Sequence, residues 1–137
     1  DFGYRVVDAD FGTAPATSAC LRRDTILRMD GRAIVTNTAH TVPASIRRLL
    51  ERNSLKTMDV DLFLLHPGSK YIVELLRAEL GLDSCAAPFM AGDYGNTVSS
   101  SIPLMLAEWW GQQSARRILL SGFGVGFTWG TCLLEAT

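Results

Sequence analysis

The sequence is poor in cysteine and in net charge. Its three cysteines, Cys20, Cys85 and Cys132, are spread over the whole of a 137-residue chain. That spacing excludes a disulfide-stapled fold and offers no close cysteine pair for zinc, so we expect reduced thiols in a cytoplasmic protein. The formal net charge is −1. This balance argues against a general nucleic-acid-binding protein, which would carry a basic excess.

Signals for a membrane or for secretion are also lacking. Residues 118–134 contain no charge, but glycines interrupt this run. We therefore predict two buried strands joined by a turn, and no membrane-spanning helix. The beginning of the chain has no basic stretch followed by an apolar core, so no signal peptide is expected. Because the chain begins at Asp1 instead of Met, we expect a fragment, a processed chain or one piece of a larger protein.

What the chain does have is enough apolar sequence for one domain, with 47% hydrophobic residues. Its periodicity alternates between the two kinds of element, which is typical of an α/β fold whose last two strands are antiparallel. A loop is predicted over residues 11–24. The predicted strands are 4–10, 60–65, 88–91, 117–124 and 127–135, and the predicted helices are 31–53, 69–80 and 98–109.

Two polar residues stand where strands end and helices follow. His66 comes directly after the apolar strand 60–65, and Asn96 lies in the turn 93–97 before the third helix. Ligands of open α/β sheets bind beyond the carboxyl ends of strands, where both side chains could donate hydrogen bonds to a substrate oxygen. The alternatives are a capping or core histidine, and an asparagine that only forms a turn or caps a helix.

Several segments together match one family. The matching pieces, in chain order, are Met29-Asp30-Gly31-Arg32, residues 42–50, residues 60–66, Tyr94-Gly95-Asn96-Thr97, Ser101-Ile102-Pro103-Leu104 and residues 122–130. Over essentially the whole chain they resemble the C-terminal half of a β-ketoacyl-ACP synthase III, a ketosynthase of the thiolase superfamily. The resemblance implies a single domain over 1–137 that forms half of a thiolase-like fold. We expect a mixed sheet of about five strands, with helices on both faces and a buried, central strand 60–65.

The resemblance also implies a reaction, the decarboxylative Claisen condensation of an acyl thioester primer with a malonyl thioester, in fatty acid or polyketide biosynthesis. His66 and Asn96 would be the catalytic pair that binds the thioester oxygen. No cofactor or metal is implied. The implied substrate-binding residues are Gly31 and Arg32 along the pantetheine tunnel, Gly68 and Ser69 after the histidine, and Phe123 and Gly124 in the acyl pocket.

The family's nucleophilic cysteine belongs to an N-terminal half that this chain lacks, so that half, or a second chain, is an expected partner. The complete protein is expected to be a homodimer that uses acyl-CoA and a malonyl thioester. His66-Pro67-Gly68 resembles the type III polyketide synthases, which use CoA thioesters, so an acyl carrier protein remains an open alternative. The arginines 47, 48 and 52 are interpreted as a solvated helix face, with carrier-protein docking as the alternative.

Two other functions remain open at this stage. One is an acyltransferase on the same fold, in which His66 would be a general base that moves an acyl group to an alcohol or amine. The other is a non-catalytic partner subunit of a heterodimeric synthase. Asn96 weighs against the acyltransferase, because simple acyl transfer needs only a cysteine and a histidine. The presence of both His66 and Asn96 weighs against the non-catalytic subunit.

Overall fold

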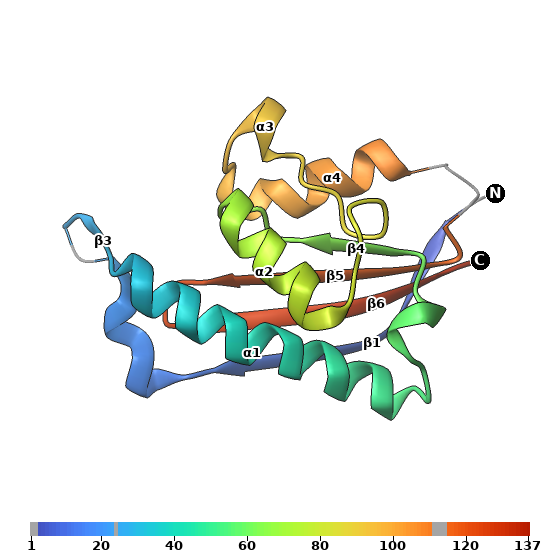
Figure 1. Ribbon diagram of the computed structural model, residues 1–137, viewed down its shortest axis with the longest axis horizontal. Coiled ribbons are helices and arrows are strands. Elements are labelled where there is room, and N and C mark those ends of the chain that lie inside the picture. The colour runs from blue at the N-terminus through green and yellow to red at the C-terminus, as the bar shows by residue number, and fades with distance from the viewer. Residues whose placement is uncertain (1–2, 24, 111–114) are drawn as a thin grey trace.

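A computed structural model describes residues 3–23, 25–110 and 115–137. Within these residues the main sheet has the strand order β1-β6-β5-β4 (Figure 1). β4 pairs parallel with β5, whereas the other neighbours pair antiparallel, so the sheet is mixed as predicted. The strands are β1 (Tyr4–Thr13), β4 (Leu62–Leu65), β5 (Arg117–Gly124) and β6 (Thr128–Ala136).

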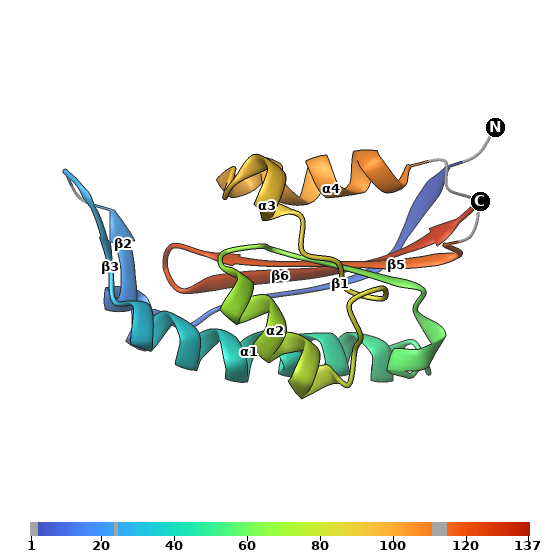
Figure 2. The same ribbon diagram turned by 45° about the horizontal axis from the view of Figure 1, so that its top comes forward.

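Helices cover both faces of this sheet, as predicted (Figure 2). α1 (Gly31–Arg52) and α2 (Lys70–Leu80) lie on one face, and α3 (Ala91–Tyr94) and α4 (Ser101–Trp109) lie on the other. The buried apolar side chains form two clusters, one on each side of the sheet. Short 3-10 turns connect the elements at η1 (Pro15–Cys20), η2 (Thr57–Asp59) and η3 (Val98–Ser100).

The helices on the first face begin and end where the sequence signals them. The Asp30 side chain accepts a hydrogen bond from the backbone N–H of Ala33 and caps α1, and Ser69 caps α2 in the same way. α2 stops at Gly81, which adopts the left-handed conformation. Pro43 lies inside one continuous α1 and does not start a second helix. The apolar stripe of α1 on both sides of Pro43 is buried against the sheet, and this packing holds the helix together.

The position of β4 corrects one expectation. All four of its residues are buried as predicted, but β4 lies at the edge of the sheet and not at its centre. Beyond it, residues 88–91 do not form the expected strand, so the main sheet has four described strands where we expected about five. On the free edge of β4, the Phe63 N–H donates a hydrogen bond to the Ala86 carbonyl at 2.7 Å. Pro88 cannot donate to a strand ladder, and α3 begins at Ala91.

The segment 11–24, expected to be a loop, is more ordered. β1 continues to Thr13 because its partner β6 extends equally far, pairing Thr13 with Thr128. After the turn η1, the strands β2 (Leu21–Arg23) and β3 (Leu27–Met29) form a separate antiparallel hairpin. In Figure 2 this hairpin projects away from the sheet at the N-terminal end of α1.

Candidate active site

His66 is held on β5 by contacts with three consecutive residues. Its backbone N–H donates to the Ser121 carbonyl at 2.8 Å, which extends the β4–β5 ladder by one residue. A Cβ added to Gly122 would lie 3.8 Å from the His66 Cβ, which is an ordinary contact distance, so Gly122 faces the base of the His66 side chain. The ring of Phe123 meets the imidazole edge to face, with centroids 5.3 Å apart. The side chain is therefore positioned by backbone and packing together.

Burial lowers the pKa of His66 below its usual value. The imidazole is consequently neutral at pH 7, with one ring nitrogen as a donor and the other as an acceptor. Gly68 adds to this enclosure, because a Cβ there would lie 3.3 Å from the Phe123 ring and 3.6 Å from the His66 Cδ2. The site thus presents a half-buried neutral histidine, which can donate a hydrogen bond without losing a proton to the solvent.

Asn96 lies in a loop with two unusual backbone conformations. Gly95 has φ +69° and ψ −168°, a region open almost only to glycine. Val98 has φ +57°, which is rare for a β-branched residue. The Val98 backbone N–H donates to the Asn96 Oδ1 at 2.9 Å. Because the oxygen of the amide is engaged in this way, its NH₂ group is the part available to an external acceptor.

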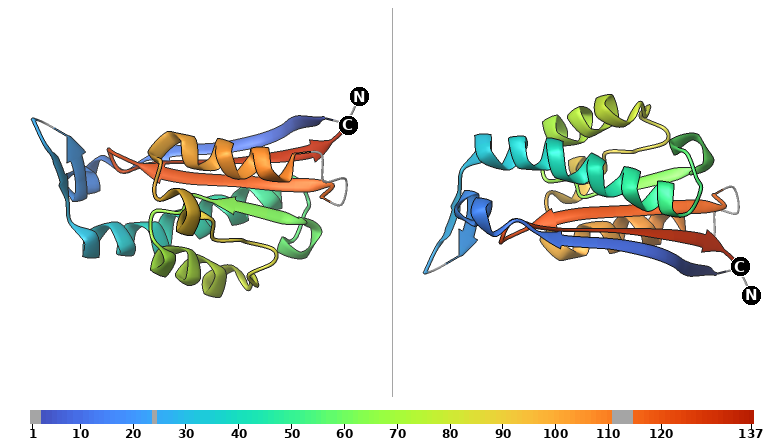
Figure 3. Two further views of the ribbon diagram at one scale, coloured as in Figure 1. Left: turned by 90° about the horizontal axis from the view of Figure 1, so that it is seen from above. Right: turned by 90° about the horizontal axis from the view of Figure 1, so that it is seen from below.

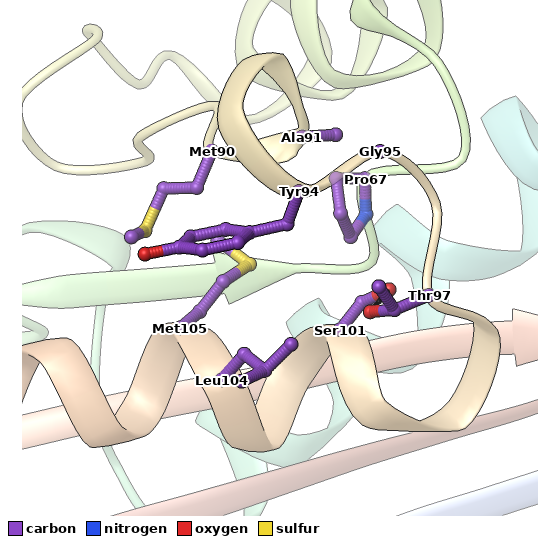
Figure 4. A pocket seen from close by; sticks show the side chains of 9 residues that line it. All are labelled: Pro67, Met90, Ala91, Tyr94, Gly95, Thr97, Ser101, Leu104 and Met105. Carbon is purple, nitrogen blue, oxygen red and sulfur yellow. Dashed lines mark hydrogen bonds between the residues drawn. The ribbon is translucent and has the colours of Figure 1, made fainter.

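The loops that carry His66 and Asn96 are neighbours. Pro67, directly after the histidine, and Gly95, directly before the asparagine, line the same small cavity of about 10 Å³ (Figure 4). The Thr97 and Ser101 hydroxyls lie 3.0 Å apart at its rim and join the Asn96 loop to the start of α4. Within the described residues no hydrogen bond joins His66 to Asn96.

The predicted substrate-binding residues fall into two groups. Phe123 and Gly124 line an open cleft of about 410 Å³ on the α4 side of β5 and β6, and Gly68 touches this group through Phe123. Arg32 lines a different cleft of about 510 Å³ beside the start of α1, where Gly31 is the first helical residue. The two clefts share no lining residue. Ser69 is exposed, and its hydroxyl caps α2.

Sequence reasoning missed two residues that shape the site. The sequence places Gly122 in the family segment 122–130 and in a turn between two strands, with no individual role, although a Cβ there would meet the Ile102 side chain at 3.2 Å. Val98 was assigned only to an apolar helix face, and its left-handed backbone has no sequence signal because valine favours extended structure. Both could have been found only from their contacts.

The arginines of α1 do not form a free basic patch. Arg48 pairs with Asp10 at 2.8 Å, and Arg52 pairs with Asp8 at 3.0 Å, both on β1. The guanidinium of Arg47 donates to the Glu79 carbonyl. These side chains are therefore engaged within the domain, which disfavours the carrier-protein docking alternative.

The described residues contain neither a membrane-spanning helix nor a metal-binding cluster. Over residues 3–23, 25–110 and 115–137, no helix is long and apolar enough to span a membrane. In the same ranges no three histidine, cysteine or acidic side chains gather as a group that could hold a metal ion.

Comparison with known proteins decides the family. The model described as 3-oxoacyl-[acyl-carrier-protein (ACP)] synthase III C terminal matches residues 50–136. The chain belongs to this family. It is 34% identical over 116 residues to β-ketoacyl-[acyl-carrier-protein] synthase III of Streptococcus pneumoniae strain Hungary19A-6, covering 81% of this chain and 36% of that one. The resemblance found in the sequence is thereby confirmed.

Solved structures of synthase III agree. The 3-oxoacyl-(acyl carrier protein) synthase III of Pseudomonas aeruginosa PAO1 superposes with a TM-score of 0.87 and 28% identity over 95% of this chain and 44% of its own. The synthase III of Aquifex aeolicus VF5 gives a TM-score of 0.89 and 26% identity with the same coverages. The fold is that of the C-terminal half of these proteins, and the chain spans less than half of their length.

Proposed function

We propose that the complete protein condenses an acyl thioester with a malonyl thioester, and that this chain supplies the oxyanion site of His66 and Asn96. The observation that carries the proposal is the pair of adjacent loops in a synthase III domain. One presents a neutral, half-buried imidazole, and the other presents an amide whose oxygen is already bonded to Val98. Both groups can donate to one oxygen without changing their protonation state.

The chemistry follows from where negative charge develops. When the malonyl C–CO₂ bond breaks, its electron pair moves into the thioester and forms an enolate, and CO₂ leaves. Donors aimed at that oxygen contribute about 3–4 kcal/mol each to the stability of the transition state. The enolate carbon then attacks the carbonyl of a cysteine-bound acyl group. The new carbon–carbon bond forms as the cysteine leaves as a thiolate.

The nucleophilic cysteine is assigned to the N-terminal half. Cys20 is buried, and burial, followed by the charge of Asp8, raises the pKa of Cys132. The raised pKa opposes formation of the Cys132 thiolate. Cys85 is exposed on a loop after α2. The proposal places the nucleophile in the partner half, where a cysteine at a helix N-terminus would be stabilised as the thiolate.

The test is release of CO₂ from a malonyl thioester by the full-length protein. His66→Ala and Asn96→Ala should each lower the rate by roughly 10²–10³. The fold-decrease in rate of the double variant should be far smaller than the product of the two single decreases, because the two donors act as one unit. His40→Ala is the matched control, since His40 is the other histidine of the chain and is exposed on α1.

Loading of the acyl primer onto the cysteine should survive both substitutions. An unchanged decarboxylation rate in Asn96→Ala would reduce Asn96 to a turn residue. Acyl transfer without CO₂ release by the unaltered protein would overturn the condensing function.

A further inference from the structure

A row of buried polar side chains crosses the otherwise apolar core beneath α1. Asp10 on β1 pairs in register with Thr131 on β6, which pairs in turn with Ser121 on β5. Ser45 of α1 reaches down to this row. All four residues are at least nine-tenths buried. We call these four residues the polar row.

Hydrogen bonds connect all four members of the polar row. Ser45 Oγ lies 2.6 Å from Asp10 Oδ2 and 2.9 Å from Thr131 Oγ1, and Thr131 Oγ1 lies 2.9 Å from Ser121 Oγ. Ser45 Oγ faces both Asp10 Oδ2 and Thr131 Oγ1 as the donor, and either hydroxyl can donate in the bond between Thr131 and Ser121. These bonds join the four side chains into one continuous set.

The carboxylate at the end of the row is held in its ionised form. Burial by itself would raise the pKa of Asp10, but hydrogen bonds from Arg48 and Ser45 bring it below the usual value. Arg48 lies 2.8 Å from Asp10 Oδ2, and Arg52 lies 3.3 Å from Oδ1. Ion pairs between Asp10 and the two arginines of α1 thus fix one end of the polar row, and each member of the row has a hydrogen-bond partner.

The other end of the row lies where His66 is held. Ser121 contributes its hydroxyl to the row and its carbonyl to the His66 backbone N–H. Of the next two residues, Gly122 faces the His66 Cβ, and the Phe123 ring contacts the imidazole. Any shift of β5 along α1 would therefore move all three of the groups that position the imidazole.

We propose that the polar row positions His66 by fixing β5 against α1 and β1. Apolar contacts are non-directional and allow packed elements to slide, whereas a small slip would break the hydrogen bonds between the buried hydroxyls and leave them unpaired. Its effect on catalysis rests on the proposed function, but its effect on the geometry of His66 does not.

The test uses the full-length protein with isotope-labelled histidine, observed by NMR. Thr131→Val keeps the volume of the side chain and cuts the row in the middle. The His66 ring resonances should move, because the imidazole lies in the ring current of Phe123, and decarboxylation should fall roughly 10- to 100-fold. Thr131→Ser restores the hydroxyl and should return both signals toward those of the unaltered protein.

Thr38→Val is the matched control. Thr38 is also a buried threonine facing the core from α1, and its Oγ1 has no hydrogen-bond partner within the described residues. This variant should leave the His66 resonances and the rate unchanged. If Thr131→Val does not fold, Ser121→Ala removes only the first hydroxyl of the row and gives the same test.

Each outcome decides the proposal. Unchanged His66 resonances in a folded variant, even with a lower melting temperature, would overturn it, because the row would then serve stability alone. Shifted resonances with unchanged decarboxylation would support the positioning of His66 and count instead against its proposed catalytic role.

Discussion

At the scale of single residues, sequence patterns located the candidate donors but not what orients them. His66 and Asn96 follow strand-like and turn-like segments, and their motifs match one family. The backbone conformation of Val98, by contrast, could not be predicted from the sequence. A β-branched residue at φ +57° costs about 1–3 kcal/mol, and no propensity predicts it, because valine favours extended backbone. Such strain is imposed by the tertiary structure and is visible only there.

Substitution of Val98 separates its strain from its hydrogen bond. Val98→Gly keeps the N–H and removes the strain, so the free energy of unfolding should rise by about 1 kcal/mol with decarboxylation retained. Val98→Pro removes the N–H and fixes φ near −65°, so the Asn96 amide loses its partner. Its rate should fall to that of Asn96→Ala. Equal rates for the glycine and proline variants would show that this bond does not orient Asn96.

The buried neutral imidazole predicts a dependence of stability on pH. Because burial lowers the pKa of His66 in the folded protein, the unfolded chain binds more protons between that value and about 6.5. The free energy of unfolding should therefore fall as the pH drops below about 6.5, and stay level above it. Urea unfolding of the full-length protein at several pH values tests this. His66→Gln should flatten the profile between pH 5 and 7, and an unflattened profile would refute the assignment.

At the scale of elements, periodicity predicted those that bury one regular face. The stripe of Val42, Ile46 and Leu49 gave α1, and the apolar run 117–124 gave β5. It failed for residues 88–91, which begin with Pro88 and form no strand; the hydrogen bond to the edge of β4 is accepted instead by the Ala86 carbonyl. Local sequence patterns do not predict which segment lies against the free edge of a sheet, because this depends on the path of the chain after α2.

The end of α2 offers a test of local backbone requirements. Gly81 has φ +68°, and a Cβ there would meet nothing within 4 Å. Gly81→Ala should therefore lower the free energy of unfolding by about 1 kcal/mol through backbone strain alone. Gly92 is equally unobstructed but lies inside α3 with no positive φ. Gly92→Ala should be neutral or stabilising, and an equal loss in both variants would contradict this explanation.

At the scale of the whole molecule, the family motifs lead us to expect a separate N-terminal half, and the chain spans less than half the length of its solved relatives. We propose that this half would cover the α4 side of the sheet. α4 contacts β4 and β5, and Figure 3 shows β1 and much of β6 uncovered on that side. Two neighbouring open clefts there share Ile102 and Leu120. Their rims carry Phe11, 77% exposed, and Trp110, 51% exposed. Large aromatic side chains left in water in this way mark an interaction surface.

Residues 1–137 expressed alone should therefore aggregate or bind a hydrophobic dye, whereas the full-length protein should do neither. Replacing both Phe11 and Trp110 by serine should reduce dye binding by the isolated segment, because these two side chains account for much of the exposed aromatic surface. Replacing Tyr71, which is 62% exposed on α2 on the opposite face of the sheet, should leave dye binding unchanged. A soluble monomer of residues 1–137 that unfolds cooperatively and binds no dye would show that this face needs no partner.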